Sequence, residues 1–358
     1  GSYGTVHLLQ VVDETTDENG RLCIGKRAWT AEDLKDMQPT LKEAKEREER
    51  CRSYWETELH CFQKLSGWFQ KNSKQGIPQL RASLVDDENH EWMVFDLIKS
   101  DNQDEDGSTP ARSLQEWMEM DRKDHQTDGN HHLFLLSQAL NIQDPLSKQQ
   151  EYIDEVLMDG EDDTAMLAAT LDKVLEDLLQ ILVEVHANDI VHRDIKPANV
   201  LVSNGQLHLI DFGSAADLDT AGPLRKNIGL SERVAISPIY AAPEVFVDPS
   251  VKRSAVKFDC FSLALLYCQL LFQYLDERTD AGFHQQLKAA NWNLNAWLAT
   301  ELAGKIRPAG IDSALLILSQ RPGMWTLLQD MLKSDPWDRV DSKTALIRHR
   351  QIMQQSKA

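Results

Sequence analysis

The sequence has 358 residues, with 38 Lys and Arg against 57 Asp and Glu, so its formal net charge is −19. Its content of 42% hydrophobic and 27% charged residues is typical of a globular protein and excludes a disordered chain. The acidic balance also argues against nucleic acid as a partner, because a phosphate backbone would be repelled.

The five cysteines are scattered, without the spacing of a disulfide framework or a structural zinc site, so we expect reduced thiols. The longest apolar stretch, residues 260–275, is too short for a membrane span and is interrupted by Ser262 and Gln269. We therefore expect a buried core helix there. The sequence begins abruptly at Gly1, so any targeting segment or membrane anchor is expected upstream of it.

Residues 1–98 contain short β-prone runs around one long helix. The helix is predicted from about Leu41 to Leu65, with a charged first half and apolar positions later. Apolar alternation and flanking turn residues predict four strands, at 5–12, 21–27, 79–86 and 91–97.

Between Ser100 and Ala165 the composition changes, with 17 acidic residues against 4 basic ones. We expect a short helix with a serine cap over 113–120. Most of 101–165 is predicted to be an acidic, partly mobile insertion, either a solvated surface without a function or a patch that attracts a substrate. Apolar spacing then predicts a helix over 164–186, and the chain beyond Phe258 is expected to be mostly helical.

The strongest chemical signal is the run IVHRDIKPANVLVSNGQLHLIDFG at residues 190–213. Apolar runs flank the dipeptide Asn204-Gly205, which predicts a hairpin because both residues tolerate a positive φ. The hairpin would bring three polar side chains close together, those of Asp194, Asn199 and Asp211.

Phosphoryl transfer requires such a set. One carboxylate must face the attacking hydroxyl, while a carboxylate and an amide oxygen hold divalent metal against the phosphates. The order HRDxKxxN followed by DFG resembles the catalytic and magnesium loops of eukaryotic protein kinases. The resemblance implies an α+β, two-lobed kinase fold that uses ATP and Mg²⁺. Residues 1–98 would form the small β-rich lobe, and residues 99–358 the larger helical lobe with the acidic insertion.

The resemblance also assigns roles to the loop residues. Asp194 would orient the substrate hydroxyl and accept its proton, and Lys196 would screen the transferring phosphoryl group. Asn199 and Asp211 would hold Mg²⁺. Lys196 is typical of serine/threonine kinases, and Ser237 takes the place of the small hydroxyl residue that contacts the catalytic aspartate. We therefore expect a protein serine or threonine as the acceptor.

Residues near the start of the chain would hold the nucleotide. The segment GSYGTV resembles the end of a glycine-rich loop, in which Gly1 and Gly4 let the backbone close over the phosphates. Val6 would form the roof of the adenine pocket. Lys26 takes the place of the phosphate-binding lysine of VAIK, although the three residues before it depart from that pattern. The alternative for Lys26 is a solvated lysine.

Lys26 requires a carboxylate partner from the long helix, where several glutamates compete. Glu58 shares a helix face with Tyr54 and Phe62, whereas Glu56 points about 200° away around the helix. A carboxylate on an apolar face needs a partner, and Lys26 would supply one. We therefore expect Glu58 to hold Lys26.

The strand at 91–97 would lead into the hinge that binds adenine. Phe95 would close the back of the pocket, and Leu201 would form its floor. Backbone groups from Asp96 to Ile98 would face the adenine. For the apolar residues, plain core packing is the alternative reading.

Other residues are expected to support the site without reacting. Glu244 would pair with a buried Arg339, and Asp259 would steady the backbone of the catalytic loop. His192 is expected to be a core histidine. Arg193 would either await a phosphate on the activation segment or be neutralised by a carboxylate there. The sequence leaves this open, with five candidates: Thr220, Ser231, Asp217, Asp219 and Glu232.

A narrower resemblance rests on residues 186–218, on the later run LNAWLATEL and on residues 258–263. These segments resemble the thylakoid state-transition kinases of plant and green-algal chloroplasts. That family implies a stroma-facing catalytic domain, held at the membrane only by an upstream anchor, that phosphorylates light-harvesting chlorophyll-binding or photosystem proteins. The alternatives are a pseudokinase scaffold, a small-molecule kinase of related fold, or a protein kinase of another signalling pathway, located in the cytoplasm.

Overall fold

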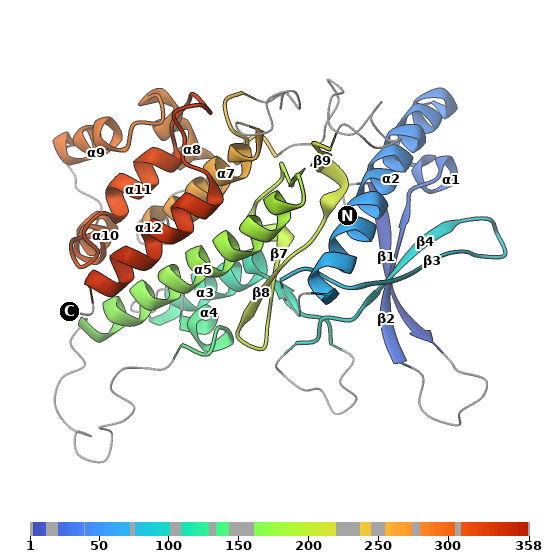
Figure 1. Cartoon of the computed structure of the whole chain (residues 1–358), viewed down its shortest axis with the longest axis horizontal. Helices are drawn as coiled ribbons and strands as arrows, with labels where there is room; N and C mark the ends of the chain where they lie inside the picture. Colours follow the sequence, from blue (N-terminus) through green and yellow to red (C-terminus); the bar gives the residue numbers. More distant parts are fainter. Residues whose placement is uncertain are drawn as a thin grey trace, which may run out of the picture.

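The architecture comes from a computed structural model that describes residues 3–11, 21–38, 40–71, 76–100, 109–128, 134–142, 161–219, 237–244, 255–273, 280–304 and 309–356. These residues form a two-lobed α+β fold, with a β-sheet and one long helix at one end and a mainly helical body at the other (Figure 1). The predicted fold class is confirmed.

The smaller lobe is built on a four-stranded antiparallel sheet in the order β1-β2-β4-β3. Lys26 lies on an interior strand, opposite Val6 on one side and Met93 on the other, so ladder hydrogen bonds hold its backbone from both sides. The strands lie at their predicted places: β1 (Gly4–Val11), β2 (Arg21–Ala28), β3 (Leu80–Val85) and β4 (Glu91–Asp96).

One long helix, α2 (Leu41–Lys71), accompanies this sheet (Figure 1). Its buried side chains recur at helical spacing, and those from Trp55 onward supply five apolar members of the main core: Trp55, Cys61, Phe62, Leu65 and Phe69. The sequence predicted an end at Leu65, but the apolar spacing continues to Phe69, and the helix extends with it. A short helix, α1 (Ala31–Leu34), precedes α2 and was not predicted.

Two described parts of the acidic region, 109–121 and 134–142, contribute side chains to the core of the larger lobe. They form β5 (Arg112–Ser113), α3 (Leu114–Asp128) and α4 (Phe134–Ala139). Their apolar side chains are buried: Leu114, Trp117, Met118, Leu136, Ala139 and Leu140. The helix expected over 113–120 is present as part of α3. The acidic, partly mobile insertion expected for much of the remainder is wrong for 134–142, because the sparse apolar positions there fall on the inward face of a short helix.

Two polar contacts organise this region. The Ser113 side chain and the Glu116 carboxylate cap the first turn of α3 reciprocally, which confirms the predicted serine cap. Asp121, 1% exposed, accepts hydrogen bonds from the amides of Leu135 and Leu136 at 2.8 and 3.2 Å. These amides lie in the first turn of α4, where helix geometry leaves donors unpaired. One acidic residue of the region is thus a structural link between two helices.

A central helix, α5 (Glu161–Ala187), precedes the motif at residues 190–213, and a β-hairpin forms part of that motif. The hairpin consists of β7 (Val200–Ser203) and β8 (Gln206–Leu209), to which β5 adds a third strand. Asn204 and Gly205 form its turn with φ of 50° and 70°, the conformation that their sequence predicted.

The described residues beyond Phe258 are mostly helical, as predicted. α7 is buried along its whole length and continues into a π-helical turn at Gln269–Gln273, so the apolar stretch that begins at Cys260 is a core helix. No helix within the described ranges is long and apolar enough to cross a membrane. The helices are α7 (Lys257–Cys268), α8 (Asp280–Ala289), α9 (Leu294–Ala303), α10 (Ala309–Ser319), α11 (Met324–Met331) and α12 (Ser342–Gln355).

Candidate active site

The loop after β6 (Ile190–Val191) carries three of the predicted residues, and they cluster around one carboxylate. The Lys196 ammonium donates to the Asp194 carboxylate at 2.6 Å and to the Ser237 hydroxyl at 2.9 Å. The Asn199 side-chain amide donates to Asp194 at 2.9 Å, and the backbone N–H of Ser237 donates to it at 3.1 Å. Asp194 is therefore fixed by partners from the loop and from the segment at 237–244.

A buried carboxylate on α7 holds the backbone of this loop. Asp259 is 0% exposed and accepts hydrogen bonds from the amides of His192 and Arg193 at 2.8 and 2.7 Å, and from His186 at 2.9 Å. Arg193 has a φ of 67°, a conformation that strains a residue with a side chain. Burial raises the pKa of Asp259, but its hydrogen bond and charge interaction with His186 outweigh burial and leave the pKa lowered. The predicted support for the loop backbone is present.

His192 is a buried part of the framework. Its Nδ1 accepts from the amide of Asp194 at 3.2 Å, and its Nε2 lies 3.0 Å from the carbonyl of Ile210. The ring also packs edge-on against Phe212, with 4.6 Å between the centroids. These contacts use both ring nitrogens, which agrees with the expected core histidine.

Arg193 is also buried, and its guanidinium donates to the carbonyls of Ser214 and Ala215 at 2.6 and 3.2 Å. Of the five candidates for its regulation, Asp217 is held by two side chains of α2, and the amide of Asp219 donates to the Asp217 carboxylate at 2.8 Å. Thr220, Ser231 and Glu232 lie outside the described residues. The structure therefore leaves the question of an activating phosphate on this segment as a prediction.

Lys26 and its partners form the opposite side of the site. The Lys26 ammonium lies 2.9 Å from Oε1 and 2.6 Å from Oε2 of Glu58, and 3.2 Å from Oδ1 of Asp211. Glu58 is 1% exposed. The structure thus places Glu58 of α2 against Lys26, as the helix periodicity predicted. Asp211 has a φ of 67°, so a second site residue occupies a strained conformation.

Tyr3, which the sequence analysis did not single out, lies inside this cluster. Its hydroxyl contacts the carboxylates of Glu58, at 2.5 Å, and of Asp211, and it accepts a hydrogen bond from Lys26 at 2.9 Å. The Tyr3 side chain is 3% exposed, and the Lys26 ammonium lies 4.4 Å from its ring centroid. A Cβ on Gly213 would lie 2.2 Å from the Tyr3 hydroxyl, so only glycine fits there.

The cluster shapes its own protonation. Burial lowers the pKa of Lys26, but the carboxylates of Asp211 and Glu58 outweigh burial, so the pKa is raised and the ammonium is retained. Burial raises the pKa of Asp211, but Lys26 and the Tyr3 hydroxyl outweigh burial and lower it to about 2. Burial, with the two carboxylates, raises the pKa of Tyr3, which therefore keeps its proton.

The glycine-rich segment is described from Tyr3 onward, and Gly1 lies outside the described residues. Gly4 begins β1 opposite Ala28, and a Cβ there would lie 2.2 Å from the carbonyl oxygen of Arg27. Val6 is 52% exposed on β1, so its side chain is free to cover a ligand. The role of these residues toward a nucleotide remains a prediction.

The hinge residues follow β4. Phe95 is buried and packs edge-on against Phe62, so for Phe95 core packing and closure of the pocket coincide. The amide of Asp96 donates to the carbonyl of Gln79 at 3.1 Å, and the carbonyl of Ile98 accepts from Ala111 at 2.8 Å. These two groups are committed to the fold, which narrows the expected adenine contacts to the other backbone groups of the segment.

The floor and the metal ligands can be placed as well. Leu201 lies on β7, partly exposed, in the hairpin between Asn199 and Asp211. Asn199 and Asp211 offer an amide oxygen and a carboxylate, a donor pair that suits Mg²⁺, which takes its remaining ligands from water and substrate phosphates. Among the described residues no three acidic, histidine or cysteine side chains form a group that could hold a metal ion.

The predicted support at the end of the activation segment is present. Arg339 is 1% exposed and bonds Glu244 through two parallel contacts of 2.6 and 2.9 Å. Its guanidinium also donates to the carbonyls of Lys333 and Lys257. This pair ties the segment at 237–244 to the loop before α12.

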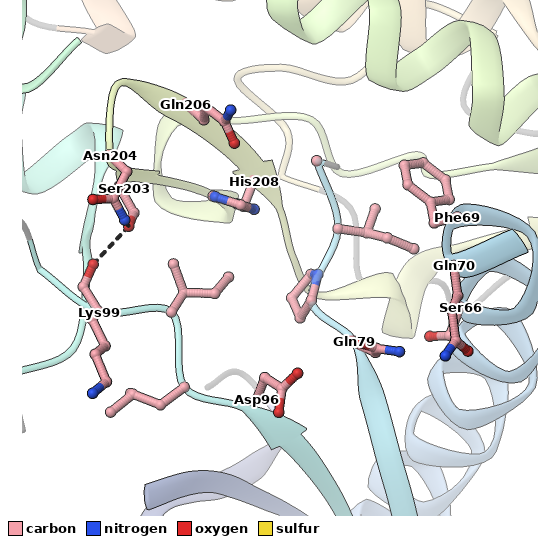
Figure 2. Close-up of a pocket in the computed structure, with 15 residues that line it drawn as sticks. Ser66, Phe69, Gln70, Gln79, Asp96, Lys99, Ser203, Asn204, Gln206 and His208 are labelled. Atoms are coloured by element: carbon pink, nitrogen blue, oxygen red, sulfur yellow. Dashed lines mark hydrogen bonds between the residues drawn. The ribbon is translucent and has the colours of Figure 1, made fainter. Parts of the chain in front are cut away.

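A cavity of about 590 Å³ lies beside the hinge, between α2, the hinge segment and the β7–β8 hairpin (Figure 2). Asp96, Gln79 and His208 are among the side chains that line it, and the Ser203 hydroxyl donates to the carbonyl of Lys99 at its edge. The hinge residues Asp96 and Ile98 line this cavity, whereas Lys26, Asp194 and Asp211 do not.

Sequence reasoning missed two features. Tyr3 stands between two glycines, a context that marks a loop and gives no sign of an inward side chain. The second feature is a contact of His60 and Lys64 with Asp217. The i, i+4 spacing of two basic residues on α2 was its only signal.

Comparisons with known proteins place the chain in a family. The family model described as "Protein kinase domain" matches residues 82–352, more than half of the chain. Among curated proteins, the Arabidopsis thaliana serine/threonine-protein kinase STN7, chloroplastic, is 28% identical over 201 residues, 48% of this chain and 34% of that protein. The serine/threonine-protein kinase STN8, chloroplastic, of the same plant is 30% identical over 164 residues, 39% of this chain and 32% of that protein. These matches span about a third of the length of either relative.

Among solved structures, the crystal structure of a Stt7 homolog from Micromonas algae soaked with ATP superimposes with a TM-score of 0.58. The match covers 97% of this chain and 88% of that one at 18% sequence identity. A likeness at this level of identity demonstrates a shared fold.

Proposed function

Because this chain belongs to the protein kinase family, we propose that it is an ATP- and Mg²⁺-dependent serine/threonine protein kinase. In this proposal residues 1–98 form the nucleotide-binding lobe and residues 99–358 the lobe that binds the protein substrate. The observation that carries the proposal is that Lys26, Glu58 and Asp211 converge in one ion-pair cluster. Asp194 lies in a second, hydrogen-bonded cluster, in the same short sequence motif as Asp211.

The roles follow from what each side chain can do. Asp194, held by Lys196 and Asn199, orients the acceptor hydroxyl and takes its proton. Lys196, between Asp194 and Ser237, neutralises charge that develops on the transferred phosphoryl group. Positioning and charge neutralisation supply most of the acceleration, and the proton transfer contributes about 10²–10⁴-fold.

The nucleotide is held from the other side. Lys26, kept charged and oriented by Glu58, binds the α- and β-phosphates. Asn199 and Asp211 would hold Mg²⁺, which when bound supplies positive charge against the phosphate oxygens. Gly1 and Gly4 close the backbone over the phosphates, while Val6, Phe95, Leu201 and backbone groups from Asp96 to Ile98 surround the adenine.

The acceptor is a protein serine or threonine. Lys196 and Ser237 support this, because they are bonded to each other beside Asp194 in the arrangement that the sequence motif predicted. The relatives named above are all serine/threonine-protein kinases.

The finer proposal concerns the substrate and the location. Two relatives are described as chloroplastic, which supports a location in the chloroplast. The resemblance of residues 186–218 to the state-transition kinases extends the proposal to the thylakoid membrane, with the catalytic domain facing the stroma and attached through an upstream segment. Its substrates would be light-harvesting chlorophyll-binding or photosystem proteins. The excess of acidic residues between Ser100 and Ala165 would attract basic substrate tails, with a rate that falls as salt is raised.

The test is transfer of labelled phosphate from ATP with Mg²⁺ to thylakoid membranes or to a generic basic protein, with Asp194→Asn as control. We expect label on serine or threonine that is lost in the control. A wild-type chain that labels no acceptor would overturn the kinase proposal and favour a scaffold. Label on the generic protein, with none on thylakoid proteins, would overturn the finer proposal alone.

A further inference from the structure

A second polar cluster joins α2 to the segment that follows Asp211. Asp217 accepts hydrogen bonds from His60 Nε2 at 2.8 Å and from Lys64 Nζ at 2.9 and 3.0 Å. The Asp217 side chain is 9% exposed, and those of His60 and Lys64 are 25% and 26% exposed. Partial burial limits screening by water, so this contact is stronger than an ordinary surface ion pair.

The backbone of Asp217 is tied to the catalytic loop. β9 (Ala216–Asp217) pairs antiparallel with β6, and Asp217 lies opposite Ile190. β6 runs directly into the loop with Asp194. The position of the Asp217 carboxylate is therefore set by the same framework that positions the proposed catalytic base.

The side chains that bind Asp217 are tied to Lys26. His60 and Lys64 lie one turn apart on α2, and Glu58 precedes His60 by two residues, about 200° around the helix. α2 is therefore gripped from two sides, by Lys26 through Glu58 and by Asp217 through His60 and Lys64. Contacts on nearly opposite faces fix the rotation of a helix, whereas a contact on one face lets it roll.

We propose that Asp217 is a positioning residue, which fixes the rotation of α2 and so keeps Glu58 against Lys26. Its catalytic consequence rests on the proposed kinase function, while its effect on the helix does not. The test therefore has two arms. The first does not measure kinase activity, and the second does.

The first arm uses Cys61, which neighbours His60 on α2 and is 0% exposed. In Asp217→Ala we expect alkylation of Cys61, followed by mass spectrometry, to accelerate about tenfold or more, because a released helix opens locally at lower cost. Cys260 and Cys268 in α7 are buried to the same degree and serve as internal controls with unchanged rates. An unchanged Cys61 rate would overturn the proposal.

The second arm measures phosphate transfer. Loss of the charged hydrogen bonds in Asp217→Ala should lower kcat about tenfold, and Asp217→Glu, which keeps the charge, should restore most of it. In a Glu58→Gln background, adding Asp217→Ala should lower kcat by less than about twofold, because Asp217 acts through Glu58. Full additivity of the two changes would overturn the proposal.

The matched control is Asp172→Ala. Asp172 pairs with Arg321 at 2.7 Å with side-chain exposures of 8% and 11%, so burial is similar, but the pair joins α5 to the segment before α11. It should lower the melting temperature and leave kcat unchanged at a temperature where the chain is folded. If wild-type chain transfers no phosphate while Cys61 still responds, the kinase proposal fails and the positioning proposal stands.

Tyr3 carries a second inference from independent contacts. Its hydroxyl lies within hydrogen-bond reach of Lys26, Glu58 and Asp211 at once. A phosphate oxygen on Lys26 would need a position about 2.7–2.9 Å from the ammonium, and Mg²⁺ on Asp211 a position about 2.0–2.1 Å from the carboxylate. The Tyr3 hydroxyl holds that space.

Tyr3 is also anchored away from the cluster, through its ring and through its backbone. Its ring packs edge-on against Tyr54 with 5.5 Å between centroids, and its carbonyl accepts from the amide of Trp29 at 3.1 Å. Displacing Tyr3 therefore has a free-energy cost that a bound nucleotide must offset. We infer that Tyr3 is a built-in competitor for the phosphates and metal of the nucleotide.

The test compares two ligands by calorimetry, Mg·ADP and adenosine, on wild type and Tyr3→Phe. The variant should bind Mg·ADP about 3–10-fold more tightly, because the competent population rises, and adenosine, which has no phosphate, with unchanged affinity. The melting temperature without ligand should fall, since hydrogen bonds of the hydroxyl are lost. Equal or weaker Mg·ADP binding by the variant would overturn the inference, and so would an equal gain for adenosine.

Discussion

The two sides of the active site are built by different means. The Asp194 side comes from one short run of sequence, and its backbone is fixed by the buried Asp259 and by pairing of β6 with β9. The Lys26 side gathers Tyr3, Lys26, Glu58 and Asp211 from four distant parts of the chain, and its contacts are between side chains.

The difference separates rigidity from adjustability. A loop whose backbone amides are bonded to a buried carboxylate can move only if that carboxylate is left with unpaired charge, which is costly. A cluster of side chains can exchange one partner for another at modest cost, since each group finds a new one. The Asp194 side is therefore rigid. The side chains of the Lys26 side can rearrange, so the geometry of the site is adjusted there.

The largest expected effect is on the fixed side. Asp194→Asn should lower kcat by about 10²–10⁴-fold, because the amide cannot accept the proton of the acceptor. Affinity for Mg·ADP, measured by calorimetry, should stay within about threefold of wild type, since Asp194 is placed toward the acceptor. Loss of nucleotide binding in a folded variant would contradict the division of the site into two sides.

Asp259→Asn tests the rigidity itself. An asparagine can offer only one oxygen to the amides of His192 and Arg193, so one buried donor loses its partner. The free energy of unfolding, from urea titration, should fall by about 1–3 kcal/mol, and transfer should fall with it because the strained Arg193 loses its support. A variant with full stability and full activity would show that the loop does not depend on this carboxylate.

Glu58→Gln tests the adjustable side. The amide keeps the shape of the carboxylate and an oxygen for Lys26, and Asp211 remains as a charged partner. We expect kcat/KM to fall about tenfold, with a smaller loss of unfolding free energy than in Asp259→Asn. A greater loss of stability in Glu58→Gln than in Asp259→Asn would reverse the comparison.

The smallest effect concerns pH. Burial raises the pKa of Asp217, but hydrogen bonds from His60 and Lys64 outweigh it and lower the pKa from 3.8 to about 2. A lowered folded-state pKa means that this contribution to stability is present above about pH 4 and is lost as the pH falls toward 2. The melting-temperature gap between wild type and Asp217→Asn should therefore shrink below pH 4. A gap that is constant from pH 6 to pH 3 would contradict this.

The contrast between the two sides also explains what the sequence could predict. Asp194, Lys196 and Asn199 lie within six residues of one loop, so the local sequence was enough to bring them together, and Ser237 joins them from a distant segment. The Asn204-Gly205 turn returns the chain to this loop, where the amide of Ile210, next to Asp211, donates to the carbonyl of Asn199. Glu58 could be chosen among several glutamates because helix periodicity places it on the apolar face. Both inferences need only the local geometry of the chain.

Other features depend on packing between distant segments. A tyrosine between glycines carries no pattern that predicts its burial against Asp211, and Asp217 was considered only as a partner of Arg193. The acidic region was misjudged for a related reason, because its high charge concealed a few apolar side chains, such as Leu136, that are fully buried. The composition of a segment does not distinguish the buried face of a helix from its exposed face, whereas burial in the folded protein depends on the face.

All five cysteines are buried and free, and burial raises the pKa of the Cys61, Cys260 and Cys268 thiols. Native thiols of this kind react slowly with alkylating dyes. One cysteine introduced on the surface of each lobe would consequently take up fluorophores ahead of the natural ones, without any prior removal of native cysteines. Energy transfer between the two dyes would then measure whether the distance between the lobes changes when a nucleotide is added, in an otherwise unaltered chain.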